Sequence, residues 1–141
     1  MNKAIHCQIL GYAGLIPFIL LPFLTVWGTV SFFEGVSFFN QYSVIILSFL
    51  GGVLWQDAIR FDKSSSQLYI AMLPSLIGWF ALALLPAMNV LWVLLCCYLL
   101  VLIYEFSVMD QQVWYRSLRI RLTAISMGGH LMMIWLLYTG F

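Results

Sequence analysis

The sequence predicts an all-α fold, a polytopic membrane protein built as a bundle of five transmembrane helices in a single domain. The first observation is composition: 64% of the 141 residues are hydrophobic and 8% are charged, whereas soluble domains carry about 25% charged residues. A soluble chain of this length would leave large apolar patches exposed. The second observation is that five apolar stretches approach the roughly 20 residues that a helix needs to cross hydrocarbon. They cover residues 9–30, 42–59, 68–85, 90–107 and 122–138.

The first stretch contains Pro17 and Pro22, which each remove a helical hydrogen bond and predict a kink. It follows Met1–Lys3 and resembles a signal peptide, but it is too long and no small-x-small cleavage site follows. We therefore expect an uncleaved first helix. Residues 31–41 come next, with four phenylalanines around Glu34, and we expect this segment to lie in the headgroup region before the second span.

The third and fourth stretches are separated only by residues 86–89, a Pro/Asn turn. Backbone polar groups cannot stay unpaired in lipid, so this short connection predicts a tight helical hairpin. The fifth stretch follows a longer polar segment that contains Asp110 and three arginines. These elements complete the five spans.

Basic residues predict the orientation. Lys3, Arg60, Lys63 and the arginines at 116, 119 and 121 all fall on one side of the expected spans, and the opposite loops hold Glu34 without Lys or Arg. The positive-inside rule then places the N-terminus in the cytoplasm and the C-terminus outside. We expect a bacterial inner membrane, because Met1–Lys3 lacks an Arg/Ser-rich transit peptide. A mitochondrial membrane is the alternative.

Several function classes have little support. A net charge of +1 and sparse basic residues predict no nucleic-acid binding. Cys7, Cys96 and Cys97 form no CxxC or Cys/His spacing, so we expect no metal site and no cofactor, only small apolar residues. P-loop, HExxH and nucleophile-elbow patterns are missing from the sequence, so we do not expect an enzyme.

One candidate ligand site is centred on His130, the ionisable residue nearest mid-membrane, on a face shared with Thr123 and Ser126. Ionisable residues at such depth are costly and often functional. Counting inward from the cytoplasmic helix ends brings four further positions to the same depth: Pro17, Gly51, Ser75 and Tyr98. The layer is either a pocket or the surroundings of a structural histidine bonded to a neighbouring helix, and the second interpretation is favoured.

Small residues mark two helix faces. Ser48, Gly52 and Trp55 share one face of the second span, and Ala124 with Gly128 share one face of the fifth. Small residues four apart let helices approach closely. Either the first face is the floor of a cavity, with Trp55 beside a ligand, or both faces are packing seams, which is the favoured interpretation.

The remaining charges gather at the cytoplasmic side, where Asp57 and Arg60, three apart on a helix, could pair. Asp57 and Glu105 are the acidic residues placed deepest in the membrane, so one interpretation is general acid/base catalysis or a proton entry site. A salt-bridge network that holds helix ends is the favoured one. The candidate partner-binding residues on this side are Asp57, Arg60, Asp110, Trp114, Arg116 and Arg119.

Four stretches carry a family resemblance: residues 10–18 (LGYAGLIPF), Tyr42 with 47–55 (LSFLGGVLW), 73–79 (LPSLIGW), and Asp110 with 114–119 (WYRSLR) and 122–123 (LT). They resemble the transmembrane protein 69 family, a family of unknown function in bacteria and mitochondria. The chain departs from it at Gln56, where the family commonly has glycine. The resemblance implies a compact multi-span membrane protein without a stated activity. It directs attention to Gly51, Gly52, Trp55, Asp110, Trp114, Arg116 and Arg119.

Two function hypotheses follow. The leading one is a non-enzymatic interaction or assembly factor that binds a membrane protein partner or a second copy of itself. Short loops and small-residue faces favour it. The alternative is a binder or carrier of a lipophilic small molecule, such as a lipid, quinone or porphyrin, held near His130. An ion or proton conduit ranks below both.

Overall fold

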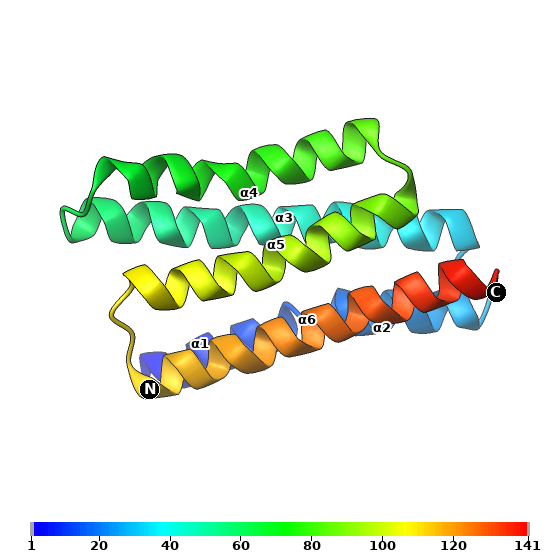
Figure 1. Cartoon of the computed structure of the whole chain (residues 1–141). Helices are drawn as coiled ribbons and strands as arrows, with labels where there is room; N and C mark the ends of the chain where they lie inside the picture. Colours follow the sequence, from blue (N-terminus) through cyan, green and yellow to red (C-terminus); the bar gives the residue numbers. More distant parts are fainter. Residues whose placement is uncertain (1, 141) are drawn as a thin grey trace.

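The structure, a computed structural model, describes residues 2–140 as antiparallel helices joined by short connections (Figure 1). Within this described range, five helical segments are long and apolar enough to cross a membrane, and the first of them consists of two consecutive helices. Within residues 2–140 there is no β-strand, so the predicted all-α class is confirmed. The elements are α1 (Lys3–Ala13), α2 (Ile16–Val26), α3 (Phe32–Arg60), α4 (Ser65–Leu84), α5 (Ala87–Val108) and α6 (Val113–Thr139).

The first span differs from its predicted bounds. It covers Lys3–Val26 instead of residues 9–30, and it is broken at Gly14 and Leu15. Pro17 is the cause, because proline has no N–H to continue a helix but fits its first turn, and it stands at the start of α2. Pro17 thus begins a new helix instead of kinking one.

Residues 31–41 form the first turns of α3, so the second span begins at Phe32 instead of residue 42 and includes the segment expected in the headgroup region. The Ser31 hydroxyl accepts a hydrogen bond from the Glu34 N–H (3.3 Å), and the Glu34 carboxylate accepts one from the Ser31 N–H (3.3 Å). This capping box starts the helix there. With 29 residues, α3 is about 43 Å long, more than the roughly 30 Å hydrocarbon core.

The bounds of other helices also differ from the predicted spans, because a helix can continue beyond the hydrocarbon layer. The hairpin turn between α4 and α5 consists only of Leu85 and Pro86, because α5 already begins at Ala87. The fifth span starts at Val113 instead of residue 122. The three arginines predicted to lie in a loop therefore stand on the first turns of α6.

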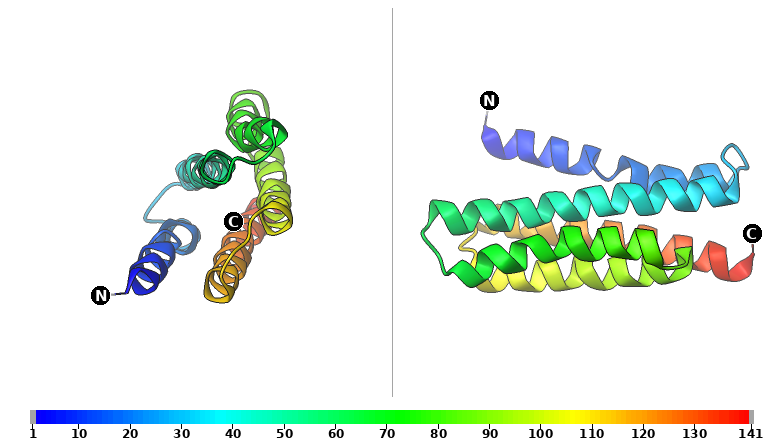
Figure 2. Two further views of the ribbon diagram at one scale, coloured as in Figure 1. Left: turned by 90° about the vertical axis from the view of Figure 1, so that its left-hand side faces the viewer. Right: turned by 90° about the horizontal axis from the view of Figure 1, so that it is seen from above.

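The helices α2, α3, α5 and α6 form a ring around one core, and α4 packs outside α3 and α5 (Figure 2). Phe18, Phe39, Tyr98 and Met133 each fill the centre from a different helix of this ring and are almost completely buried. By contrast, α1 packs mainly against α6 and has no buried residue. The amino-terminal half of the first span thus lies at the margin of the bundle.

Glycines show which helix faces pack within the chain. A Cβ at Gly51 would lie 2.5 Å from the Ala71 carbonyl oxygen of α4, and one at Gly129 would lie 2.8 Å from the Phe18 oxygen of α2. A Cβ at Gly52 or Gly128 would meet nothing within 4 Å. The predicted seams through Gly52 and Gly128 are therefore wrong for packing inside the chain. The close helix contacts are made by the adjacent glycines, Gly51 on α3 and Gly129 on α6.

Candidate functional site

His130 lies on α6 with no exposed surface, and both of its ring nitrogens have partners. Nδ1 is 2.7 Å from the Ser126 carbonyl oxygen, and Nε2 is 2.7 Å from the Ser43 hydroxyl. A carbonyl oxygen only accepts, so Nδ1 carries the proton, and in the neutral imidazole Nε2 then accepts the hydrogen bond that Ser43 donates. The Tyr98 hydroxyl donates to the Ser43 carbonyl oxygen at 2.7 Å. The histidine is thus held in one neutral tautomer.

Aromatic rings close this cluster. The ring centroid of His130 lies 4.9 Å from Phe39, 5.2 Å from Tyr98 and 5.7 Å from Phe18. These rings come from three different helices and surround the imidazole. The geometry is that of a histidine satisfied by its own chain, the interpretation that the sequence favours.

Of the predicted ligand residues, only Tyr98 lies beside His130. Gly51 packs against α4, and Ser75 is half-buried on α4, which stands outside the ring. Trp55 is 40% exposed on the outer face of α3. Residues at equal depth along the membrane normal can face different sides of their helices. Grouping residues by depth therefore combined side chains that lie apart in the bundle.

Ser43, the hydrogen-bond donor to His130, was not among the residues predicted from the sequence. A signal was present, because Ser43 interrupts the buried stripe of α3 between Phe39 and Leu47, at helical spacing. A hydroxyl on an otherwise apolar stripe within a membrane needs a partner. That reasoning would have paired it with a buried polar residue of another helix.

A second buried polar cluster lies nearer the end of the bundle that carries the N-terminus. Arg119 of α6 binds Glu105 of α5 side-on: Nε is 3.0 Å from each carboxylate oxygen, and Nη2 is 2.7 Å from Oε2. Gln111 also donates to Glu105 Oε1 at 2.6 Å. Glu105 is 1% exposed and Arg119 is 5% exposed. This bidentate pair joins α5 to α6 and neutralises both charges inside the bundle.

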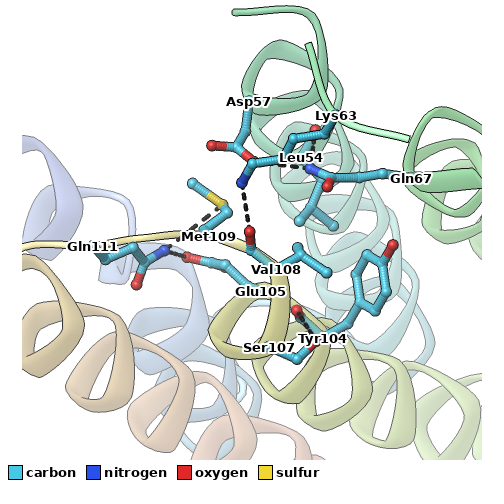
Figure 3. A network of polar contacts seen from close by, with 10 residues as sticks. All are labelled: Leu54, Asp57, Lys63, Gln67, Tyr104, Glu105, Ser107, Val108, Met109 and Gln111. Carbon is cyan, nitrogen blue, oxygen red and sulfur yellow. Dashed lines mark hydrogen bonds and ion pairs between the residues drawn. The ribbon is translucent and has the colours of Figure 1, made fainter. Parts of the chain in front are cut away.

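A third cluster joins the α3–α4 turn to the end of α5 (Figure 3). Lys63 Nζ lies 2.5 Å from Asp57 Oδ2 and also donates to the Val108 carbonyl oxygen. Gln67 donates to Asp57 Oδ2 (2.9 Å) and to the Leu54 carbonyl oxygen (3.0 Å). The predicted pairing of Asp57 with Arg60 is therefore wrong, because Lys63 folds back from the turn and takes the carboxylate.

The other predicted partner-binding residues stay near the surface. The Arg60 guanidinium lies 5.3 Å from the Phe61 ring centroid, and the Arg116 guanidinium lies 4.6 Å from that of Phe106. Asp110 is exposed, whereas Trp114 is half-buried and donates from Nε1 to the Gln112 side chain. The six candidates thus divide into two members of buried ion pairs, Asp57 and Arg119, and four residues nearer the surface.

The outer face of α3 carries a shallow groove of about 420 Å³ that extends to the connection between α5 and α6. Phe49, Gly52, Gln56 and Met109 line it, and Arg60 stands at its polar end.

Among residues 2–140, no three His, Cys, Asp or Glu side chains gather as a metal site would require.

These helices and buried polar clusters define a polytopic α-helical membrane protein with five membrane-spanning segments. Residues 4–135 match the family described as Protein of unknown function (DUF3429), and the chain belongs to that family. It is 33% identical over 124 residues to Transmembrane protein 69 of Xenopus tropicalis, a match that covers 83% of this chain and 49% of the relative. The chain thus spans about half the length of that relative, and the resemblance seen in the sequence is confirmed. No solved structure matches the chain.

Proposed function

We propose that this protein is a non-enzymatic interaction or assembly factor that binds another membrane protein, or a second copy of itself, through its lipid-facing helix surfaces. The observation that carries the proposal is the division of the glycines into two sets. Gly51 and Gly129 are used for helix contacts inside the chain, whereas Gly52 and Gly128 face outward beside open space. Small residues on a membrane helix let a neighbouring backbone approach closely.

The first outward face is the groove on α3. Gly52 forms its floor between the larger side chains of Phe49 and Gln56, so a helix from another chain can approach the α3 backbone there. Phe49 is 67% exposed. A partner helix would cover this ring and would bring a hydrogen-bonding group to the Gln56 amide.

The second outward face lies on α6. Ala124 and Gly128 are four residues apart and exposed, and Leu131 and Trp135 continue the same face with about half of their surface exposed. This small-xxx-small spacing, followed by large apolar side chains, fits close helix association in a membrane. Two such faces on one small chain support a role in joining other proteins.

Orientation and location belong to the same proposal. The basic residues of the N-terminus, the α3–α4 turn and the start of α6 stand at one end of the bundle (Figure 1). We place this end in the cytoplasm, because positive charge is retained on that side. The membrane we propose is the bacterial inner membrane, with a mitochondrial membrane as the alternative.

The test is native mass spectrometry of the protein extracted gently from its own membrane in lipid nanodiscs. We expect a stoichiometric second polypeptide, either a different membrane protein or a second copy. Gly52→Leu and Gly128→Leu each fill one outward face, and we expect at least one of them to reduce the bound polypeptide about tenfold or more.

Ala83→Leu is the matched control, because Ala83 is also exposed on a membrane helix but has no small residue beside it on its face. This variant should keep the bound polypeptide. A protein that always emerges alone, or one whose two glycine variants both keep the polypeptide, would contradict the proposal.

The second candidate function is the binding of a lipophilic small molecule. The His130 cluster does not favour it, since the histidine is enclosed by its own aromatic neighbours. A cavity beside Arg119 and Thr123 does favour it. We rank an ion or proton conduit lower, because both nitrogens of His130 already hold partners within the chain.

A further inference from the structure

A small cavity lies where the first span breaks, between α1 and α2 on one side and α3 and α6 on the other. Its volume is about 130 Å³. Most of its lining is apolar, with Leu15, Phe18 and Leu50 among the buried residues. An apolar cavity with a few converging polar groups is the usual form of a small-molecule site.

The cavity opens sideways towards lipid. Leu10 of α1 and Phe49 of α3 form part of its wall, and they are 71% and 67% exposed. Because α1 packs mainly on α6 and buries none of its residues, it leaves a passage beside α3. A ligand would therefore enter from the membrane rather than from water.

Arg119 supplies the first free donors. Its Nε and Nη2 bind Glu105, but among the described residues Nη1 has no hydrogen-bond partner. A guanidinium offers five N–H groups in a planar fork, so the edge that includes Nη1 remains open to an acceptor. Arg119 lines the cavity, where such an acceptor would bind.

Thr123 supplies the second free donor. It is 3% exposed and lines the cavity one turn beyond Arg119, and its hydroxyl has no partner among residues 2–140. The other two hydroxyls of the lining are in use, because Tyr98 donates to the Ser43 carbonyl and Ser126 to the Leu122 carbonyl. A buried hydroxyl without a partner is costly, and a ligand oxygen would satisfy it.

The charges around the cavity determine which kind of hydrogen-bond acceptor a ligand can carry. Glu105 and Arg119 neutralise each other, so an anionic ligand would add an uncompensated charge in a region of low dielectric. A neutral acceptor avoids this cost. A carbonyl oxygen accepts two hydrogen bonds without carrying charge, which matches one N–H of Arg119 and one O–H of Thr123.

The volume of the cavity limits the size of the ligand group that it can hold. A cavity of about 150 Å³ in another protein is known to hold a benzene molecule, and this one is of similar size. We propose that the cavity binds the ring of a neutral, carbonyl-bearing lipophile of the quinone type. Its carbonyl lies between Arg119 and Thr123, and its apolar tail leaves between α1 and α3. This inference goes beyond the proposed partner-binding role and uses different polar residues, although Phe49 borders both the cavity and the groove on α3.

The test titrates the purified full chain in micelles with a benzoquinone that carries a short isoprenoid tail, and native mass spectrometry measures the bound fraction. We expect saturable binding of one molecule per chain. The same isoprenoid tail without a ring should bind at least tenfold more weakly. Dioleoylglycerol, whose ester carbonyls offer the same acceptor without a ring, should not displace the probe.

Two variants connect the binding to this cavity. Thr123→Val keeps the shape but removes the hydroxyl, so the Kd should rise about five- to tenfold, the equivalent of one hydrogen bond. Ile46→Trp fills the cavity from α3 and should abolish binding. Thr139→Val makes the same change as the first variant at the exposed end of α6 and should bind the probe as the unaltered protein does.

Absence of saturable binding overturns the inference, and so does unchanged binding in both cavity variants. Displacement by dioleoylglycerol would overturn the assignment of a ring. Partner association measured in the same Thr123→Val sample should be unaffected, and Gly52→Leu should keep its affinity for the probe. Failure of this inference is therefore distinguishable from failure of the proposed function.

Discussion

The two buried polar layers of α6 contrast with each other. His130 and Arg119 stand eleven residues apart, about 16 Å along the helix. Around His130 each ring nitrogen has a partner and three aromatic rings close the space. Around Arg119 the ion pair is complete, yet a cavity remains beside it with an unpaired hydroxyl at Thr123.

The broken first span explains this difference. Its second half, α2, packs on both α3 and α6 and brings Phe18 against His130. Its first half, α1, packs mainly on α6 and leaves the side of α3 open near Arg119. One helix break thus closes one polar layer and opens the other. A polar residue buried in a membrane protein therefore indicates a ligand site only when its own chain leaves it room.

The largest expected effect comes from Arg119→Met. This change leaves the Glu105 carboxylate buried without a counter-charge, so the free energy of unfolding should fall by about 3–5 kcal/mol. Thermal unfolding in micelles measures it. The double variant Glu105→Met/Arg119→Met should recover most of the loss, because no lone charge remains. A single variant as stable as the unaltered chain would show that the pair does not hold α5 to α6.

A smaller loss is expected for His130→Leu. Ser43 loses its acceptor and the Ser126 carbonyl loses its donor, which should cost about 1–3 kcal/mol. Binding of the quinone probe should stay unchanged, since His130 does not line the cavity. Normal stability together with loss of probe binding would contradict this expectation. It would place the binding site at His130 instead of at the cavity beside Arg119.

The smallest effect is expected for the stability of Thr123→Val without ligand. Removing an unpaired buried hydroxyl should leave the free energy of unfolding unchanged or raise it by up to about 1 kcal/mol. Ser126→Ala removes a paired hydroxyl on the same helix and should not stabilise the protein. A clear loss of stability in Thr123→Val would mean that this hydroxyl has a structural partner, and the case for a ligand there would weaken.

Sequence and structure agree most closely where a local property decides. The existence of five apolar spans and the position of the α4–α5 hairpin follow from composition and from a proline, so both were predictable. The capping box at Ser31 is equally local and was readable in the S-x-x-E spacing. Helix ends were placed too early or too late because hydropathy measures the hydrocarbon layer, whereas a helix continues until a cap or a proline stops it.

The sequence by itself determined the class of protein, the presence of five membrane-spanning segments and the gathering of positive charge at one end. It also determined that His130 needed a partner, since an ionisable group in lipid must be satisfied. Only the tertiary structure decided that the partner is Ser43, that Lys63 takes Asp57, and that Gly51 packs while Gly52 faces outward. The physical reason is rotation about the helix axis. A shift of one residue turns a side chain by about 100°, and the neighbouring helices determine which face of each span turns inward.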